Sequence, residues 1–240
     1  MTACRLGVLA FGDSITNGGG ELQWGVALQS WALWVARGLG LPYSPFATDG
    51  ACASDVVGTQ VPAVPAGGRY HLGCLYVGVN DVRARDWDRR AFERDHAAAL
   101  AFLAGRCDRV LTLTVPLDLA RPRAGAKVRE ANAAIEASAH QAGALVLDLR
   151  AFGARNLLMA DHVHPTAFGQ LAIAERALDL LAADGLPPRV RPSTLIHYET
   201  TRAKRLRGDL TYAYRHAKVS ARAAAIRTAA GWRRRRRRAE

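Results

Sequence analysis

Short apolar runs that alternate with segments of helical periodicity restrict the fold of this chain more than any other feature. Runs of strand length recur at 6–11, 43–47, 73–77, 110–115 and 144–149. Helical spacing of apolar residues occupies 24–39, 87–104, 126–142 and 166–183. Strands that alternate with helices in this way predict a parallel sheet covered on both faces. The expected fold class is therefore α/β, a three-layer α/β/α sandwich around a five-stranded parallel sheet of the flavodoxin-like kind.

Charge is concentrated at one end of the chain. The formal net charge is +12, but residues 1–188 hold 17 Lys and Arg against 18 Asp and Glu, whereas residues 189–240 hold 16 against 3. Pro187 and Pro188 lie where the charge changes and cannot continue a helix. We therefore expect a near-neutral globular domain over 1–188 and a basic helical extension over 189–240.

The extension has the pattern of an amphipathic helix. Apolar residues recur at three- and four-residue steps over 202–228, which predicts one or two basic helices with Gly208 as a break. The six arginines Arg233–Arg238 repel one another and should be disordered when free. The extension could pack on the domain as a solubilising tail, or it could attach to an anionic membrane surface or an acidic partner. Nucleic acid ranks lower, because interleaved aromatic residues for base stacking are missing.

Cysteine usage and segment lengths set further limits. Cys4, Cys52, Cys74 and Cys107 have neither C-x-x-C spacing nor Cys/His pairing of the zinc type. Gly18–Gly20 lacks the lysine or the glycine spacing of a nucleotide-binding loop. We therefore expect no metal and no cofactor. The apolar runs are too short for a secretory signal or a membrane span, which predicts a cytoplasmic protein with reduced thiols, either free or peripheral at the membrane.

Polar or small residues follow four of the five predicted strands. They are Gly12-Asp13-Ser14 after the first strand, a small-residue turn at 48–55 after the second, Gly78-Val79-Asn80-Asp81 after the third, and Asp161-His162-Val163-His164-Pro165 after the fifth and a short loop. The carboxyl ends of parallel strands meet at one edge of the sheet, where open α/β sheets bind their ligands. We therefore expect these side chains to converge.

Three of these residues predict nucleophilic catalysis. Ser14 is the candidate nucleophile and His164 the candidate base. The Asp-x-x-His spacing lets Asp161 reach the Nδ1–H of His164, which leaves Nε2 facing a serine hydroxyl. His162 is a rival base, but it is adjacent to Asp161 in sequence and reaches that carboxylate less easily. The alternative is structural, with Gly-Asp-Ser as an ordinary polar turn and the Asp161 segment as a helix cap.

Oxyanion donors are also available at the same edge. Asn80 can direct its amide N–H₂ into the site, although an Asx-turn is its structural alternative. The N–H of Ser14 is a second donor, and Ala53 or Gly50 in the small-residue turn could supply a third. Each such donor stabilises a tetrahedral intermediate by about 3–4 kcal/mol.

In these motifs the chain resembles the SGNH (GDSL-type) hydrolase superfamily, over about residues 5–185. Gly12–Ser14 matches the first block, Gly78–Asp81 the third, and Asp161–Pro165 the last. The resemblance implies a serine nucleophile, a histidine base from the last block and its orienting aspartate. It also implies that asparagine and a glycine N–H complete the oxyanion hole, in a flexible site that accepts esters or thioesters of varied acyl length.

The second block departs from the family pattern. Thr48 falls where asparagine is common, and Ala53 falls where the oxyanion glycine is expected. A main-chain N–H survives a Gly→Ala change if the backbone angle tolerates a Cβ atom. Gly50 is the alternative donor in another register, so this assignment stays open.

Four tryptophans lie near the predicted site in sequence. Trp24, Trp31 and Trp34 have helical spacing, so core packing is the default, although Trp24 could line an acyl pocket and Trp87 could rim the site. The leading hypothesis is a serine esterase, lipase or thioesterase that acts on a small-molecule ester or thioester. The rival is a catalytically silent binding protein that acts through its basic tail, but it would not need Ser14, Asn80 and His164.

Overall fold

The computed structural model confirms the α/β fold with five parallel strands. It describes residues 5–23, 26–122, 124–154, 156–196 and 200–236. The strands are β1 (Val8–Gly12), β2 (Tyr43–Pro45), β3 (Tyr70–Tyr76), β4 (Cys107–Leu113) and β5 (Leu145–Leu147). They form one sheet in the order β2-β1-β3-β4-β5, and every neighbouring pair is parallel.

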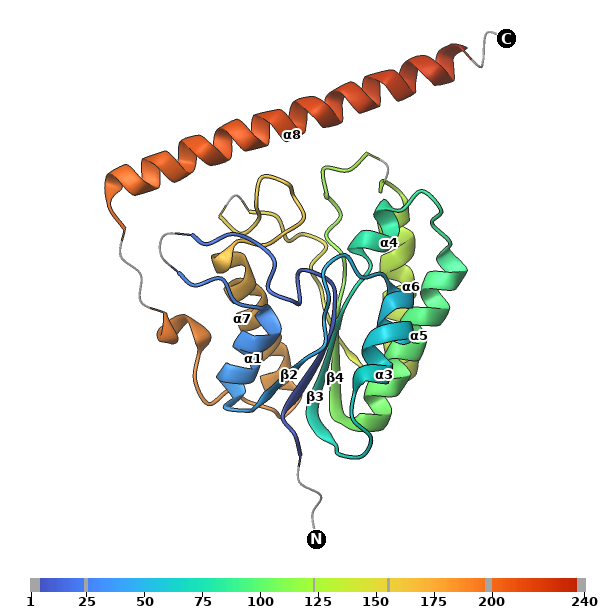
Figure 1. Ribbon diagram of the computed structural model, residues 1–240, viewed down its shortest axis with the longest axis vertical. Coiled ribbons are helices and arrows are strands. Elements are labelled where there is room, and N and C mark those ends of the chain that lie inside the picture. Colours follow the sequence, from blue (N-terminus) through green and yellow to red (C-terminus); the bar gives the residue numbers. More distant parts are fainter. Residues whose placement is uncertain (1–4, 24–25, 123, 155, 197–199, 237–240) are drawn as a thin grey trace.

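Helices cover both faces of the sheet, as a sandwich requires. The helices α1 (Trp31–Leu39) and α7 (Ala167–Ala183) pack together on one face, while α5 (Arg89–Arg106) and α6 (Lys127–Ala142) pack together on the other (Figure 1). All five residues of β1 are buried, as expected for a central strand covered twice. Side-chain caps start α5 and α7: Asp88 accepts from Arg90 and Ala91, and Thr166 accepts from Gly169.

The first helix is shorter than its sequence pattern predicts. It begins at Trp31 rather than at residue 24, because the hydroxyl of Ser30 accepts the N–H of Ala32 and caps it there. Trp31 and Trp34 are buried in the core, whereas Trp24 lies outside the described residues. Trp87 packs against Phe92 and donates to Glu130 of α6.

Several short helices follow strands β2 and β3 at the carboxyl edge of the sheet. The segments α2 (Ala53–Asp55), η1 (Val56–Gln60, a π-helix) and α3 (Val61–Ala63) succeed one another after β2. The helix α4 (Val79–Arg83) follows β3 directly, and a 3-10 turn, η2 (Pro192–Leu195), follows α7. These turns were not expected as helices, since small and polar residues give them no helical period.

The extension forms one long helix, α8 (Arg202–Arg236), which passes through Gly208 without the predicted break. One glycine costs a helix about 1 kcal/mol, which good helix formers on both sides and contacts with the domain can offset. Four of the six terminal arginines are helical where disorder was expected, since each residue added to an existing helix gains a hydrogen bond. Arg237 and Arg238 lie outside the described residues.

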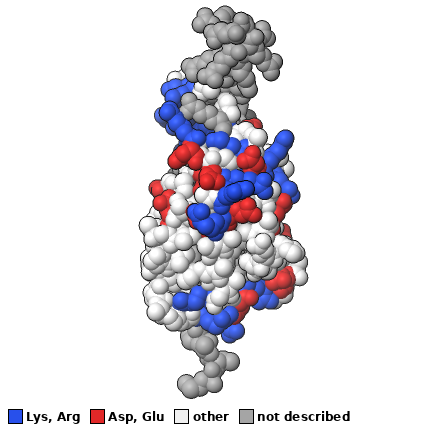
Figure 2. All heavy atoms as spheres, turned by 90° about the vertical axis from the view of Figure 1, so that its right-hand side faces the viewer, with Lys and Arg blue, Asp and Glu red and all other residues white. Residues whose placement is uncertain are grey.

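The helix α8 lies across the carboxyl edge of the sheet (Figure 1). Its less exposed residues recur at helical spacing and mark the face toward the domain: Asp209, Tyr212, His216, Val219, Ser220 and Ala223. On the face that Figure 2 shows, Lys and Arg are most frequent in the half of the domain near α8, with Asp and Glu among them, and a smaller charged group lies at the opposite end. No helix in the described part of the chain is long and apolar enough to cross a membrane.

Candidate active site

Ser14, His164 and Asp161 form one hydrogen-bonded line at the carboxyl edge of the sheet. The Oγ atom of Ser14 lies 2.9 Å from Nε2 of His164. Nδ1 of His164 lies 2.7 Å from Oδ2 of Asp161. The other carboxylate oxygen, Oδ1, accepts the N–H groups of Val163 and His164 at 2.9 and 3.0 Å. The structure thus brings together the three residues that the sequence proposes as nucleophile, base and orienting acid.

The electrostatics of this line favour a charged carboxylate beside a basic histidine. Burial raises the pKa of Asp161, but the hydrogen bonds from the His164 ring and from the Val163 and His164 N–H groups outweigh it and bring the pKa to about 2. The hydrogen bond to Asp161 raises the pKa of His164 above its ordinary value. A proton taken from Ser14 would therefore be held by an imidazole whose positive charge Asp161 stabilises.

The nucleophile lies in a turn that only glycine can begin. Gly12 has φ +151, and a Cβ atom there would lie 2.4 Å from the carbonyl oxygen of Tyr76. After it, Oδ1 of Asp13 turns back to accept the N–H of Ile15 at 2.9 Å. The chain then closes when the N–H of Gly19 donates to the carbonyl of Ser14. Ser14 is held half-buried at the mouth of this turn.

Gln60 fixes the strand end before the nucleophile. Its Oε1 accepts the N–H of Gly12 at 2.9 Å, and its Nε2 donates to the carbonyl of Gly12 at 2.8 Å. Nε2 also reaches Oγ1 of Thr48 at 3.2 Å. This buried amide thereby supplies the backbone pairing that a further strand would give.

Gln170 of α7 holds the other end of the nucleophile turn. Its Nε2 donates to the carbonyls of Ile15 at 2.9 Å and Gly19 at 3.1 Å, while its Oε1 accepts the N–H of Trp31. The side chain is fully buried. Neither glutamine was identified from the sequence, because their partners are 48 and 155 residues away for Gln60–Gly12 and Gln170–Ile15.

Asn80, the side chain that the sequence proposes as an oxyanion donor, lies in α4. Its Nδ2 donates to the carbonyl of Ala51 at 3.1 Å, and Oδ1 faces Nη1 of Arg83 at 3.5 Å. An amide nitrogen carries two hydrogens, so one remains for a substrate oxygen. The N–H of Ser14 donates to no acceptor among the described residues.

The two second-block candidates have different surroundings. The N–H of Ala53 donates to Oδ1 of Asp81 at 3.0 Å in the protein interior. The φ angle of Ala53 is not positive, so its backbone accommodates a Cβ atom where the family expects glycine. Gly50 has φ +79 and lies exposed on the preceding turn.

His162, the rival base, faces α8. Its Nε2 lies 3.0 Å from Nδ1 of His216, and the two rings stack with centroids 4.9 Å apart. His162 has φ +59, in the left-handed region. The carboxylate of Asp161 bonds the ring of His164 instead.

Two further carboxyl groups are buried beneath the candidate triad. Burial raises the pKa of Asp13 to about 7 and that of Asp81 to about 6. One oxygen of each carboxyl group has no hydrogen-bond partner within the described part of the chain. Their place beside Ser14 and Asn80 in sequence could have indicated them.

Across the described ranges, no group of His, Cys, Asp and Glu side chains could hold a metal ion, and Cys52, Cys74 and Cys107 are free thiols. Cys4 falls outside those ranges.

Comparison with known proteins identifies the family. A model of the GDSL-like lipase/acylhydrolase family matches residues 10–172, more than half of the chain. The chain belongs to this family. Membership confirms the SGNH hydrolase resemblance and indicates a hydrolase. The matched residues end before α8 begins at Arg202.

Solved structures share the fold at low sequence identity. LAE5, an α/β hydrolase from the metagenome of Lake Arreo, is 18% identical with a TM-score of 0.61, over 73% of this chain and 94% of its own. A lipolytic G-D-S-L family protein from Veillonella parvula is 20% identical with a TM-score of 0.59, over 73% and 97%. Axe2, an acetylxylan esterase from Geobacillus stearothermophilus, is 19% identical with a TM-score of 0.59, over 75% and 96%. No curated protein matches this chain.

Proposed function

We propose that this protein is a serine hydrolase that cleaves carboxylic esters or thioesters through an acyl-enzyme. The observation that carries the proposal is the continuous line from Ser14 Oγ through the His164 ring to the Asp161 carboxylate, with contacts of 2.9 and 2.7 Å. This is the arrangement that activates a serine hydroxyl. Catalytic mutants of the acetylxylan esterase replace a serine and a histidine by alanine, the two residue types assigned here to attack and proton transfer.

The reaction runs in two halves. Ser14 Oγ attacks the carbonyl carbon while its proton passes to Nε2 of His164, and Asp161 stabilises the resulting imidazolium. When the tetrahedral intermediate collapses, His164 gives that proton to the leaving oxygen or sulfur, and the acyl group stays on Ser14. A water molecule then attacks the acyl carbon with His164 as base, which releases the acid and restores Ser14.

The N–H of Ser14 and the second amide hydrogen of Asn80 are the proposed oxyanion donors. Ala53 remains a candidate third donor, on the condition that its N–H leaves Asp81 or shares its hydrogen between two acceptors. Gly50 is the weaker candidate because it lies on the exposed side of the turn.

Hydrolysis of p-nitrophenyl esters from acetate to long acyl chains tests this proposal. We expect turnover that falls at least ~10³-fold in Ser14→Ala, since the triad acts as a unit. Ser54→Ala is the matched control, because Ser54 is an exposed serine of the second block. Equal loss in both variants, or turnover that survives Ser14→Ala, would overturn the serine mechanism.

A second candidate function is attachment of α8 to an anionic membrane surface. Leu206, Leu210 and Tyr214 are 60, 63 and 70% exposed on the face of α8 opposite to the domain. Lys and Arg flank this apolar stripe and continue to Arg238, a pattern that binds anionic lipid.

The protein should co-sediment with phosphatidylglycerol vesicles but not phosphatidylcholine vesicles, and Leu206→Ser with Leu210→Ser should weaken this binding without loss of ester turnover. Equal binding to both vesicles would contradict it.

A further inference from the structure

The helix α8 and the domain together line an open cavity of about 460 Å³. On the α8 side, Val219, Ala223 and Ile226 give it an apolar wall. Ala223 is only 5% exposed, so α8 contacts the domain closely here. Three arginines from separate parts of the chain complete the lining: Arg83 of α4, Arg121 of the loop before α6, and Arg222 of α8.

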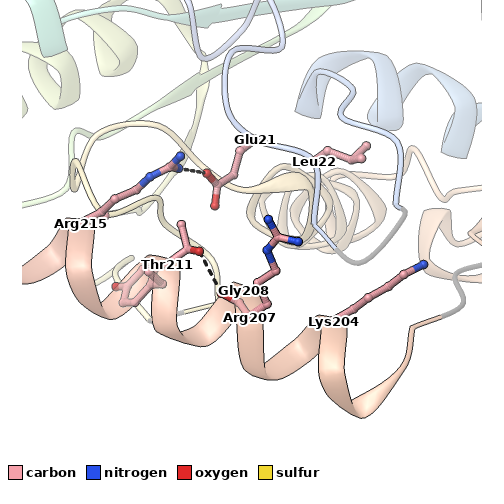
Figure 3. Close-up of a pocket in the computed structure, with 9 residues that line it drawn as sticks. Glu21, Leu22, Lys204, Arg207, Gly208, Thr211 and Arg215 are labelled. Carbon is pink, nitrogen blue, oxygen red and sulfur yellow. Dashed lines mark hydrogen bonds and ion pairs between the residues drawn. The ribbon is translucent and has the colours of Figure 1, made fainter.

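The charge of this cavity is uncompensated. No Asp or Glu lines it, and within the described ranges none of the three guanidinium groups forms an ion pair. A second cavity, of about 290 Å³, lies under the other end of α8 (Figure 3). There Glu21 lines the cavity together with the cations and accepts a hydrogen bond from Arg215 at 2.9 Å. The cavity beside Asn80 has no such internal partner.

One residue that lines this cavity contacts a proposed oxyanion donor. Arg83 lies one helical turn after Asn80, and its Nη1 is 3.5 Å from Oδ1 of that side chain. Its charge also reaches His164, where it opposes the rise in pKa that the hydrogen bond from Asp161 produces. A group bound between Arg83 and Arg222 would therefore lie near Asn80, the proposed side-chain oxyanion donor.

We propose that this cavity binds an anionic group of the substrate, so that the preferred esters carry a carboxylate or phosphate beside a short apolar segment. The inference rests on the proposed ester hydrolysis. Guanidinium groups pair with carboxylates and phosphates through two parallel hydrogen bonds, and the α8 residues supply contact for the hydrocarbon. A soluble anionic ester and an anionic phospholipid headgroup share this chemistry.

A matched pair of soluble esters tests the charge preference. With the full-length protein at low salt, kcat/KM for the p-nitrophenyl monoester of glutaric acid should exceed that for p-nitrophenyl pentanoate at least ~10-fold. Arg222→Gln and Arg121→Gln should each remove most of this preference by raising KM for the anionic ester, with the neutral ester unaffected. Arg207→Gln, which changes an arginine lining the other cavity, is the control and should preserve it.

The outcomes separate this inference from the proposed function. A preference for the anionic ester that survives Arg222→Gln, with turnover that still depends on Ser14, overturns the anion site and leaves the esterase intact. If Ser14→Ala still hydrolyses both esters, the esterase proposal fails. Titration calorimetry with pentyl phosphate then tests the cavity alone, and binding that Arg222→Gln does not weaken overturns it.

A lipid arm distinguishes the two sources of the anion. Acyl release from phosphatidylglycerol vesicles that is faster than from phosphatidylcholine vesicles, and that Arg222→Gln slows, identifies a phospholipid headgroup. A preference confined to the soluble monoester identifies a soluble anionic ester. If the protein prefers the anionic member neither of the soluble ester pair nor of the vesicle pair, the inference is overturned.

Discussion

The nucleophile turn and α8 meet at the same edge of the sheet but are held in opposite ways. Gln60 and Gln170 hold the turn through buried amide hydrogen bonds. The helix α8 is held by exposed and half-exposed contacts such as the ion pair between Arg215 and Glu21, whose side chains are 54 and 35% exposed. The turn lies inside the family-matched residues and α8 lies beyond them. We therefore propose that the chemistry belongs to the buried part that the family model matches, and the selectivity to a helix outside the matched residues.

The largest effect on kcat is expected at the proposed catalytic residues. Asp161→Asn keeps the shape of the side chain but removes the charge that stabilises imidazolium, so kcat should fall about 10³–10⁴-fold. In the proposed mechanism the neutral imidazole is the base, so activity should rise as pH increases through the pKa of His164. The hydrogen bond to Asp161 raises that pKa. Removing the charge of Asp161 should therefore move the acid limb of kcat/KM to lower pH. Kinetics from pH 5 to 9 measure both effects.

Exposed Asp179 provides the control for that substitution, because it pairs with Arg191 at the far end of the domain. Asp179→Asn should leave kcat and the acid limb unchanged. An acid limb that stays in place in Asp161→Asn, with kcat near that of the parent, would contradict the assigned role of Asp161.

Removing a buried clamp should affect stability and activity together. Gln170→Leu leaves the N–H of Trp31 and the carbonyls of Ile15 and Gly19 without their partner, at a cost of about 1–3 kcal/mol each. We expect a loss of about 3–5 kcal/mol in the free energy of unfolding, measured by urea titration. In the remaining folded protein kcat should fall more than KM changes, because Ser14 is displaced. Gln141→Leu on the exposed face of α6 should change neither quantity.

The buried carboxyl group beside Ser14 makes stability depend on pH. The pKa of Asp13 is raised from 3.8 to about 7, so the folded state holds a proton that the unfolded state has lost between these values. Parent stability should therefore decline as pH rises from about 4 to about 7 and stay low above that range. Asp13→Asn removes this ionisation, so relative to the parent it should gain about 2–4 kcal/mol between pH 4.5 and 8.

Urea titrations at several pH values measure that difference. Asp148→Asn is a useful contrast, because the hydrogen bonds from Arg150 lower the pKa of exposed Asp148 to about 2. The contribution of Asp148 to stability is therefore lost as pH falls, whereas that of Asp13 is lost as pH rises. A constant difference between the parent and Asp13→Asn across the pH range would contradict a neutral Asp13.

Sequence reasoning predicted the parts of this molecule that depend on local pattern. Each of the five strands appears near its apolar run, and Ser14, His164 and Asp161 lie together because their motifs follow strands that share one edge. Ser30 was an available signal for the start of α1, since serine is a favoured helix cap. The helical period was extended past it because apolar residues continue toward residue 24.

Contacts between distant segments could not be predicted in this way. The bond from the Ala53 N–H to Asp81 depends on how the turn after β2 packs against α4. The amide groups of Gln60 and Gln170 look like any other glutamine in the sequence. The basic, amphipathic pattern indicated that α8 would be a helix, but not that it would lie over the candidate site. Its direction is set by contacts such as that of His216 with His162.

The smallest effect is expected at a single exposed contact of α8. Arg215→Gln removes the 2.9 Å ion pair with Glu21, and exposed pairs of this kind contribute about 0–1 kcal/mol because water and salt screen them. The free energy of unfolding should therefore change by less than about 1 kcal/mol, and kcat for a neutral ester should stay within about two-fold of the parent. Ala223→Arg is the sharper counterpart, since it adds a like charge beside Arg83, Arg121 and Arg222 at a buried contact of α8 and should loosen this helix without touching the glutamine clamps. Hydrogen exchange should then rise along α8 and stay unchanged in the nucleophile turn. Faster exchange in both regions would mean that the turn and α8 form one cooperative unit, and that chemistry and selectivity are not held separately.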